Sequence, residues 1–301
     1  MRELWQRGAI ALMLVGIVSG CNLTAPPRPS RLPQVGREKP RGQPPALKPG
    51  TREPIGSGVN NRNLLLGNPS SAAPSVASSN NYLMVKPQFV LSYNSKTHTA
   101  NWVSWQLNRS WIGAADRQDN FRPDDALPAA WYKVRPNDYA GSDYDRGHIA
   151  PSADRTRNEA DNSSTFLMTN MMPQVPEVNR GVWGDLEEYC RELVQQGKEL
   201  YIIAGPVGRK GSIGRKEKIA VPAKNWKVIA VLDRQGLGMQ GINANTRTIA
   251  VMVPNDSSVK GKGWKSFRVS VKQVERETGL NFLSNVPLQV QQVIESKVDG
   301  Q

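Results

Sequence analysis

The sequence predicts an α+β protein whose folded part is one domain of about 220 residues that starts near Asn81. Short segments rich in aromatic residues and Val recur along this part, as is typical of strands. Longer segments with a helical pattern lie among and after them, and the sequence contains no internal repeat. This mixture favours a central, antiparallel-leaning sheet flanked by helices.

Eight segments have strand composition and three have the pattern of helices. The expected strands lie at residues 82–85, 89–93, 101–107, 165–169, 200–204, 227–232, 247–253 and 267–271. The expected helices lie at residues 180–196, 271–277 and 287–298, and the second ends close to Gly279, as helices often do. His98 lies in a polar turn between two of the strands, where we expect an exposed side chain.

The first 20 residues have the pattern of a signal peptide. Arg2 and Arg7 precede an apolar run at residues 8–20, which is too short to span a bilayer but suits a signal sequence. Small residues stand just before Cys21, which resembles a bacterial lipoprotein signal in which this cysteine is lipidated after cleavage. An ordinary cleaved signal with an incidental cysteine is the alternative. In both cases we expect an exported protein, in the periplasm, in the outer membrane as a lipoprotein, or outside the cell.

Residues 21–80 are expected to form a disordered, Pro-rich basic linker. Residues 22–80 hold 11 of the 22 Pro, no Phe, Trp or Tyr, and 8 Lys and Arg against 2 Asp and Glu. Such a stretch buries too little apolar surface to offset the entropy lost when it becomes ordered. This leaves residues 81–301 as the folded domain.

The net charge of +13 is weak support for a nucleic-acid-binding surface, because about half of the basic excess lies in the linker. A solvated basic face that keeps the protein soluble explains the charge equally well. The two Cys exclude a disulfide-built scaffold. Cys190 is expected to be a small buried hydrophobe rather than a nucleophile.

His148 is the main candidate for a chemical role. It ends an extended segment with the sequence Asp-Arg-Gly-His, from Asp145 to His148. The pKa of an imidazole suits a general base, the glycine allows close backbone approach, and Arg146 can hold a phosphate. Taken alone, however, the tetrapeptide favours a structural histidine beside an ion pair.

Two residues downstream have the spacing of a sparse metal site. Asn179 lies at or near a helix start, and Glu187 follows eight residues later, two turns along roughly the same face. One amide oxygen with one distant carboxylate suits Mg²⁺, which keeps several waters and takes its remaining oxygens from a substrate phosphate. The pair suits neither Ca²⁺ storage nor Zn²⁺.

Each of these residues also has a purely structural explanation. Asn179 could cap the helix. Glu187 could belong to a solvated row of carboxylates on the same helix. Arg117, which stands upstream in an Asp-rich segment, could pair with Asp116 or Asp119 on the surface.

The motifs occur together with the segments RQDNFRPD at residues 117–124 and TFLMTNMMPQ at residues 165–174. In this combination and order the chain resembles the DNA/RNA non-specific endonuclease family, which includes secreted bacterial nucleases and mitochondrial endonuclease G. The resemblance is greatest to the sugar-non-specific nucleases that cyanobacteria secrete. It covers residues 81–298 without large gaps and leaves the linker out.

The resemblance implies a ββα-metal (His-Me finger) core, in which a hairpin presents His148 and the following helix supplies Asn179. His148 would be the general base, and Asn179 would be the direct protein ligand of one Mg²⁺ or Mn²⁺. Arg117 and Arg146 would bind the scissile phosphate and its transition state.

Three further roles follow from the same resemblance. Glu187 would hold water around the metal, and Asn170 would support the histidine and the substrate geometry. Asp145 would orient its neighbours rather than take part in the chemistry.

The implied activity is hydrolysis of phosphodiester bonds in double- and single-stranded DNA and in RNA, which leaves 5′-phosphorylated products. Contacts mainly to phosphates give affinity without sequence readout. A small polypeptide inhibitor is a partner that the resemblance also suggests. Two other functions stay open: a catalytically inactive nucleic-acid-binding lipoprotein, and a phosphodiesterase acting on a substrate other than nucleic acid. The intact His148 and Asn179 argue against the first.

Overall fold

The computed structural model describes residues 61–215 and 218–301 of the chain. The predicted signal peptide at residues 1–20, the lipid anchor at Cys21 and the linker up to residue 60 lie outside the described residues and stay predictions. In the described part, no helix has both the length and the apolar character needed to cross a membrane.

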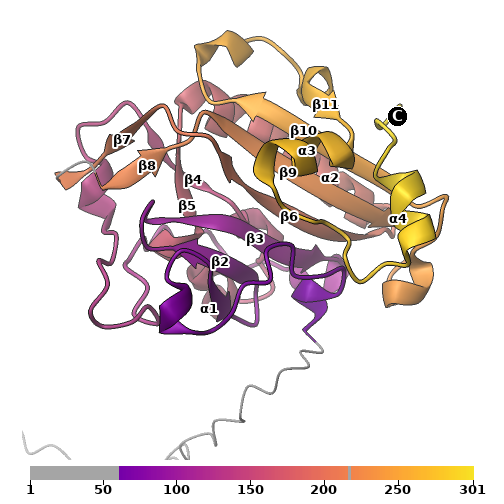
Figure 1. Cartoon of the computed structure of the whole chain (residues 1–301), viewed down its shortest axis with the longest axis horizontal. Helices are drawn as coiled ribbons and strands as arrows, with labels where there is room; N and C mark the ends of the chain where they lie inside the picture. Colours follow the sequence, from indigo (N-terminus) through magenta and orange to yellow (C-terminus); the bar gives the residue numbers. More distant parts are fainter. Residues whose placement is uncertain (1–60, 216–217) are drawn as a thin grey trace, which may run out of the picture. The chain divides into compact units, whose positions relative to one another are not determined.

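A seven-stranded sheet forms the centre of the domain (Figure 1). Its strand order is β1-β2-β3-β6-β9-β10-β11, and every neighbouring pair is antiparallel. The predicted α+β class with an antiparallel sheet is therefore confirmed, and seven of the eight expected strands lie in this sheet. Its strands are Tyr82–Val85 (β1), Val90–Asn94 (β2), Thr99–Leu107 (β3), Glu199–Val207 (β6), Lys224–Leu232 (β9), Arg247–Pro254 (β10) and Arg268–Val269 (β11).

The prediction of a strand at residues 165–169 is wrong. These residues follow helix α1, Glu159–Ser164, and form turns, and the strand begins only with β5, Met171–Gln174. The segment is apolar because its side chains are buried in the core next to His148. Its backbone does not pair in a β-sheet. Phe166 is fully buried there, with its ring centroid 4.9 Å from that of His148.

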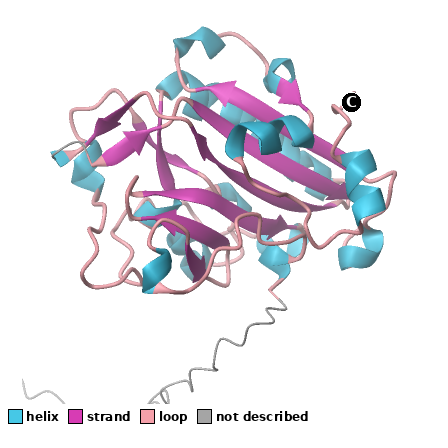
Figure 2. Ribbon diagram, viewed as in Figure 1, coloured by secondary structure: helices cyan, strands magenta, loops and turns pink. Residues whose placement is uncertain are grey.

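The two faces of the large sheet pack against different elements (Figure 2). One face buries Trp105 against the core that includes helix α2, Trp183–Gln195. The other face buries Trp102 in the core that includes helices α3, Val271–Thr278, and α4, Leu288–Ile294. The sheet thus separates two hydrophobic cores. The elements that carry the candidate site residues lie on the α2 side.

The three predicted helices are present, two of them with shorter bounds and the third longer by one residue. Helix α3 ends before Gly279, whose φ of 71° lies in the left-handed region that favours glycine. Helix α4 ends at Ile294 instead of residue 298, and Val298 forms an isolated bridge with Ser270. Helix α2 begins at Trp183 instead of residue 180, because a turn precedes it.

The structure differs from the predicted linker over residues 61–80, which pack onto the domain. Leu64 is 9% exposed and belongs to the same core as Trp102. The indole nitrogen of Trp102 donates to the Ser70 hydroxyl at 2.8 Å, and Ala73 forms a bridge with Tyr82. The segment lacks aromatic residues, but its leucines and small polar residues complete a core whose aromatic side chains come from the sheet.

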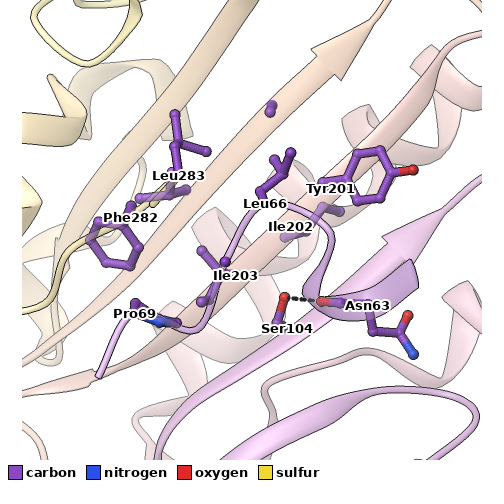
Figure 3. A pocket seen from close by; sticks show the side chains of 12 residues that line it. Asn63, Leu66, Pro69, Ser104, Tyr201, Ile202, Ile203, Phe282 and Leu283 are labelled. Atoms are coloured by element: carbon purple, nitrogen blue, oxygen red, sulfur yellow. Dashed lines mark hydrogen bonds between the residues drawn. The ribbon is translucent and has the colours of Figure 1, made fainter. Parts of the chain in front are cut away.

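A small apolar cavity marks where this segment meets the C-terminal part of the chain (Figure 3). Leu66 lies on one side of it, and Phe282 and Leu283 lie on the other. The Ser104 hydroxyl donates to the backbone oxygen of Asn63 at its edge. The cavity is about as large as one water molecule, at roughly 20 Å³, and is best understood as a packing defect.

Two short hairpins complete the domain. One pairs β4, Asp145–His148, with β5, and the other pairs β7, Gly211–Ile213, with β8, Ile219–Val221. Apolar side chains of the second hairpin share a core with Met171 of the first. The hairpin that carries His148 is therefore held between α2 and a second hairpin.

Two single-residue predictions have different outcomes. Cys190 is buried as expected, and burial raises the pKa of its thiol to about 12, which makes it a poor nucleophile at neutral pH. The prediction of an exposed His98 is wrong: the side chain is half-buried, and its ring lies 5.2 Å from that of Tyr132. Its backbone has a φ of 57°, in the left-handed region.

The packing of residues 61–80 can be tested with Leu64→Ala. We expect the free energy of unfolding to fall by about 2–3 kcal/mol, because the change removes a buried leucine and leaves a cavity. The measurement is urea denaturation of the mature protein. Val76→Ala is the control, since Val76 is 59% exposed and should change stability by less than about 0.5 kcal/mol. Equal, small effects of both substitutions would contradict the assignment.

Candidate active site

The β4–β5 hairpin and the turn before α2 carry four of the predicted residues, namely Asp145, Arg146, His148 and Asn179. In the hairpin, His148 pairs with Met171 and Asp145 pairs with Gln174. The chain then forms a wide turn, Val178–Val182, which carries Asn179 and breaks at Gly181 before α2 begins. This is the arrangement of two strands and a helix that the resemblance implied.

Gly147 is needed where it stands in β4. A Cβ atom placed on it would lie 1.9 Å from the Gln174 side-chain oxygen, so any larger residue would displace this buried side chain. The close approach at this glycine is therefore made by the Gln174 side chain of the partner strand. It keeps His148 in register with β5.

His148 lies between two phenylalanine rings. Its ring centroid is 5.6 Å from that of Phe121 and 4.9 Å from that of Phe166, and both rings meet it edge to face. Each phenylalanine in turn carries an arginine: the Arg146 guanidinium lies 4.2 Å from the Phe121 centroid, and that of Arg117 lies 4.9 Å from the Phe166 centroid. Two cations thus flank one buried imidazole.

This setting keeps His148 neutral. Burial, together with the positive charges of Arg117 and Arg146, lowers the pKa of its imidazole to about 3. The side-chain atom Nε2 is buried and has no hydrogen-bond partner among the described residues. A neutral imidazole with a free nitrogen can accept a proton, as a general base must.

A polar pocket of about 540 Å³ opens beside this cluster. Both arginines line it, and Arg117 is fixed by hydrogen bonds to Asp119 at 2.7 Å and to the Ser152 hydroxyl at 2.8 Å. His148 is not among the lining residues, since it lies beneath Phe121. The lining comes from four stretches of chain, namely Arg117, Asp119 and Phe121; Pro136, Asn137, Tyr139 and Ala140; Tyr144, Asp145 and Arg146; and Asn179 and Arg180.

Asp145 orients Asn179 in this pocket. The Asn179 side-chain nitrogen donates to Asp145 at 2.9 Å, and Arg180 donates to the same carboxylate twice, at 2.9 and 2.7 Å. Burial acts to raise the pKa of Asp145, but the hydrogen bonds from Arg180 and Asn179 outweigh it and lower the pKa. Because an ionised carboxylate can only accept hydrogen bonds, the amide nitrogen faces Asp145 and the amide oxygen faces away.

The oxygen of Asn179 fits a hydrated divalent cation. It accepts no hydrogen bond from the described part of the chain, and it belongs to a roomy polar pocket. No group of three or more His, Cys, Asp and Glu that could hold a metal occurs within residues 61–215 and 218–301. One hard oxygen donor suits Mg²⁺ or Mn²⁺, which can keep most of their waters, and does not suit Zn²⁺.

Asn170 is a positioning residue. It is fully buried, and its side chain accepts from the Ala150 backbone nitrogen at 2.9 Å and donates to the carbonyls of Ala150 and Thr165 at 2.8 and 2.9 Å. These bonds use up its amide, so it cannot touch a substrate. They hold the chain two residues beyond His148 against the start of β5.

Glu187 lies on α2 but does not line the pocket. Because the chain breaks at Gly181, Asn179 and Glu187 are not on one continuous helix face as the sequence suggested. The side chain of Glu187 is 14% exposed, and it lies 3.4 Å from the ammonium group of Lys227. Burial raises the pKa of this carboxyl to about 7, while the charge of Lys227 acts to lower it.

Four residues of this site were missed by the sequence reasoning. Phe121 and Phe166 lie inside segments that carry the family resemblance, but a lone phenylalanine gives no sign that it packs on a histidine. Arg180 is adjacent to Asn179 in the sequence, and this position could have suggested that it pairs with Asp145, the residue that Asn179 contacts. Lys227 had no signal beyond being a charged residue in a strand whose other residues are mostly apolar.

These features define the class of protein. A buried neutral base, two arginines and one free amide oxygen around a polar pocket suit the hydrolysis of a phosphodiester with the help of a divalent cation. The strands and helix that present them form a ββα-metal core.

Comparisons with known proteins agree with this class. A family model described as DNA/RNA non-specific endonuclease matches residues 67–289. The protein named Nuclease from Nostoc sp. strain PCC 7120 is 60% identical over 239 residues, which cover 79% of this chain and 86% of that protein. Human mitochondrial endonuclease G is 31% identical over 217 residues, which cover 68% and 70%. A chain in the solved EndoG/EndoGI complex has a TM-score of 0.63 at 24% identity, and the match covers 75% of this chain and 91% of that one.

The chain belongs to the DNA/RNA non-specific endonuclease family. It is a nuclease, a hydrolase whose substrates are nucleic acids, and its family depends on divalent metals. The likeness to the solved EndoG structure shows that the fold is shared. The family match begins at residue 67, within the segment that the structure packs onto the domain.

The burial of His148 predicts a pH dependence of stability. The pKa of this group is lower in the folded chain, at about 3, than the ordinary value near 6.5 that applies when the chain unfolds. The unfolded chain therefore binds the proton more tightly, and stability falls as the pH drops from about 6.5 toward 3. The contribution of one proton has a slope of at most about 1.4 kcal/mol per pH unit.

Denaturation at several pH values checks this, with His148→Asn as the comparison because asparagine does not titrate. The wild type should lose stability more steeply than the variant below pH 6.5, and the two should run parallel above it. Parallel curves over the whole range would show that His148 is not a buried neutral group.

Proposed function

We propose that this chain is an exported endonuclease that hydrolyses DNA and RNA without regard to the sugar, with His148 as general base and one Mg²⁺ or Mn²⁺ on Asn179. The observation that carries the proposal is that His148 lies directly behind the two arginines of the pocket that Asn179 also lines. A neutral imidazole lies between two arginines, and an amide oxygen that Asp145 turns outward lies in the same pocket as those arginines.

Arg117 and Arg146 bind the scissile phosphate. Their guanidinium groups are already placed on aromatic faces before the substrate arrives, and Arg117 is also held by Asp119 and Ser152. Fixed donors of this kind stabilise negative charge on the phosphoryl oxygens without having to reorganise. Tyr144 and Asn137 also line the pocket.

His148 takes a proton from the water that attacks phosphorus. In the free protein the pKa of His148 is too low for an efficient base, because burial opposes its charged form and both arginines add to this effect. A bound phosphate neutralises these arginines, so it raises the pKa of His148 toward the working pH. The base thus becomes effective when the substrate is in place.

Asn179 holds the cation through its side-chain oxygen, and Asp145 and Arg180 keep that oxygen in position. When bound there, the cation supplies positive charge to the phosphoryl and leaving oxygens. Glu187 orients water on the α2 side of the site, and the products carry 5′-phosphates, as in the implied family chemistry. Asn170 keeps the histidine strand in register.

The absence of base readout follows from what the pocket offers. Its cationic groups are arginines suited to phosphates, and no step uses the ribose 2′-hydroxyl, so both DNA and RNA fit. Binding through phosphates should weaken as salt is raised. Export, lipidation of Cys21 and blockage of the pocket by a small polypeptide inhibitor belong to the same proposal. The last is supported by the likeness to a chain of the EndoG/EndoGI complex.

The deciding experiment is a cleavage assay on the purified mature protein with plasmid DNA, single-stranded DNA, and single- and double-stranded RNA. We expect all four to be cut with Mg²⁺ or Mn²⁺, and no cleavage with EDTA. Asn179→Ala should need a much higher Mn²⁺ concentration or lose activity altogether, whereas Asn80→Ala, an exposed asparagine outside the pocket, should not. Cleavage that persists in EDTA, or an unchanged Mn²⁺ requirement in Asn179→Ala, would refute the metal part of the proposal.

His148→Ala tests the base. We expect a loss of at least ~10³-fold in kcat, at the upper end of general-base effects, because no other residue of the cluster has a neutral proton acceptor. The control is His98→Ala, which changes the one other histidine. Circular dichroism should show that both variants are folded. Turnover close to that of the wild type in His148→Ala would reject this assignment.

A further inference from the structure

Lys227 is a buried lysine in the middle of the central sheet. It lies in β9, paired with Ala204 of β6 on one side and Val251 of β10 on the other, and its side chain is 1% exposed. Lysine is rarely buried, because removing an ammonium ion from water costs several kcal/mol unless other groups compensate. Its retention at this position calls for a physical reason.

The surroundings of the Lys227 ammonium are unusual. It lies 4.2 Å from the ring centroid of Trp183 and 5.7 Å from that of Trp105, so two aromatic faces take the place of water. Its one hydrogen bond among the described residues goes to Glu187, at 3.4 Å. An ammonium group has three donors, and only one of them is used here. The single partner of the charge is therefore the Glu187 carboxylate.

Another buried cation of the domain shows the contrast. Arg155 is fully buried, but its guanidinium donates four hydrogen bonds, to the backbone oxygens of Gln88, Gln106 and Asp154, which satisfy it within the fold. Arg155 therefore has a structural role that its contacts explain. Lys227, in contrast, has Glu187 as its one polar partner among the described residues.

The other charged groups near Lys227 are already paired. Asp154 accepts from the indole nitrogen of Trp105 at 2.9 Å and from Arg191 at 3.2 Å. Cys190 lies nearby on α2 as a buried thiol. Glu187 is thus the one carboxylate in this cluster that has no cation other than Lys227 in contact with it in the described part of the chain.

This cluster is tied to the candidate active site by the turn Ser152–Asp154. Its first residue, Ser152, accepts a hydrogen bond from Arg117, and its last, Asp154, pairs with Arg191 of α2. The turn begins four residues after His148. The charge cluster under α2 is therefore connected to the pocket by a short series of hydrogen bonds and ion pairs.

We propose that Lys227 is a positioning residue of the nuclease site, which favours the charged form of the buried Glu187 carboxylate and holds it in a fixed orientation. This inference rests on the proposed function, in which Glu187 orients water beside the metal. A carboxyl group as buried as Glu187 would take up a proton if its cation were removed, and a neutral carboxyl would no longer order water in the same way. Residues that orient water and ligands in this manner typically change activity 10–100-fold when mutated.

The experiment compares Lys227→Met, Lys227→Arg, Glu187→Gln and the double variant Lys227→Met with Glu187→Gln. Lys224→Met is the matched control, because Lys224 lies on the same strand with its side chain 41% exposed and pairs with Glu277. For each protein we measure kcat against pH, and the melting temperature in EDTA, which reports on the fold without metal.

We expect Lys227→Met to lower kcat at least ~10-fold at pH 7, with part of the loss recovered at higher pH, where Glu187 ionises again. Lys227→Arg should retain more activity. In the Glu187→Gln background, Lys227→Met should cause less than a 3-fold further loss, because its partner is already gone. The double variant should melt in EDTA at or above the wild-type temperature, since it replaces a buried ion pair by neutral groups. Lys224→Met should behave as the wild type.

Three results would overturn the inference. The first is wild-type activity in Lys227→Met, and the second is the same fold-loss from Lys227→Met with and without Glu187→Gln. The third is a double variant that no longer folds, which would show that Lys227 is needed for folding rather than for positioning Glu187. Full activity of Glu187→Gln alone would instead refute the role of Glu187 in the proposed function. The two failures are thus distinguishable.

Discussion

The packing of His148 between Phe121 and Phe166 is the constraint on which the site depends. The two rings remove water from the imidazole, and each also offers a face to an arginine. One arrangement therefore sets the charge state of the base and the place of the phosphate-binding cations. A ring lost on either side would release both an arginine and the histidine, so the groups act as a unit.

The large sheet supplies the stability that allows polar groups to be buried in this arrangement. Its α2 face buries Trp105 and the neighbouring apolar side chains in a continuous core, and this burial offsets the cost of the polar groups placed beside it. Nε2 of His148 has no partner among the described residues, and Lys227 has one hydrogen bond. Such under-satisfied groups are expected where function, rather than stability, selects the residue.

The sequence predicted the fold class and seven of the eight strands, but it could not give the local geometry around the site. Motif order identified His148, Arg117, Arg146 and Asn179, and the structure brings them to one cluster. Spacing along the chain could not reveal the break at Gly181, which separates Asn179 from the helix face of Glu187. Strand composition misled at residues 165–169, and the lack of aromatic residues misled at 61–80, because burial there is decided by distant parts of the chain.

The role of Asp145 follows from its hydrogen bonds with Asn179 and Arg180. A single amide oxygen is a weak ligand, and an amide can turn so that its nitrogen points into the pocket instead. Asp145 prevents this, because an ionised carboxylate rejects the oxygen and accepts the nitrogen. Arg180, largely exposed, keeps Asp145 ionised and in place through two hydrogen bonds. The pocket can therefore rely on one protein oxygen for the metal, because two charged residues determine which way that oxygen points.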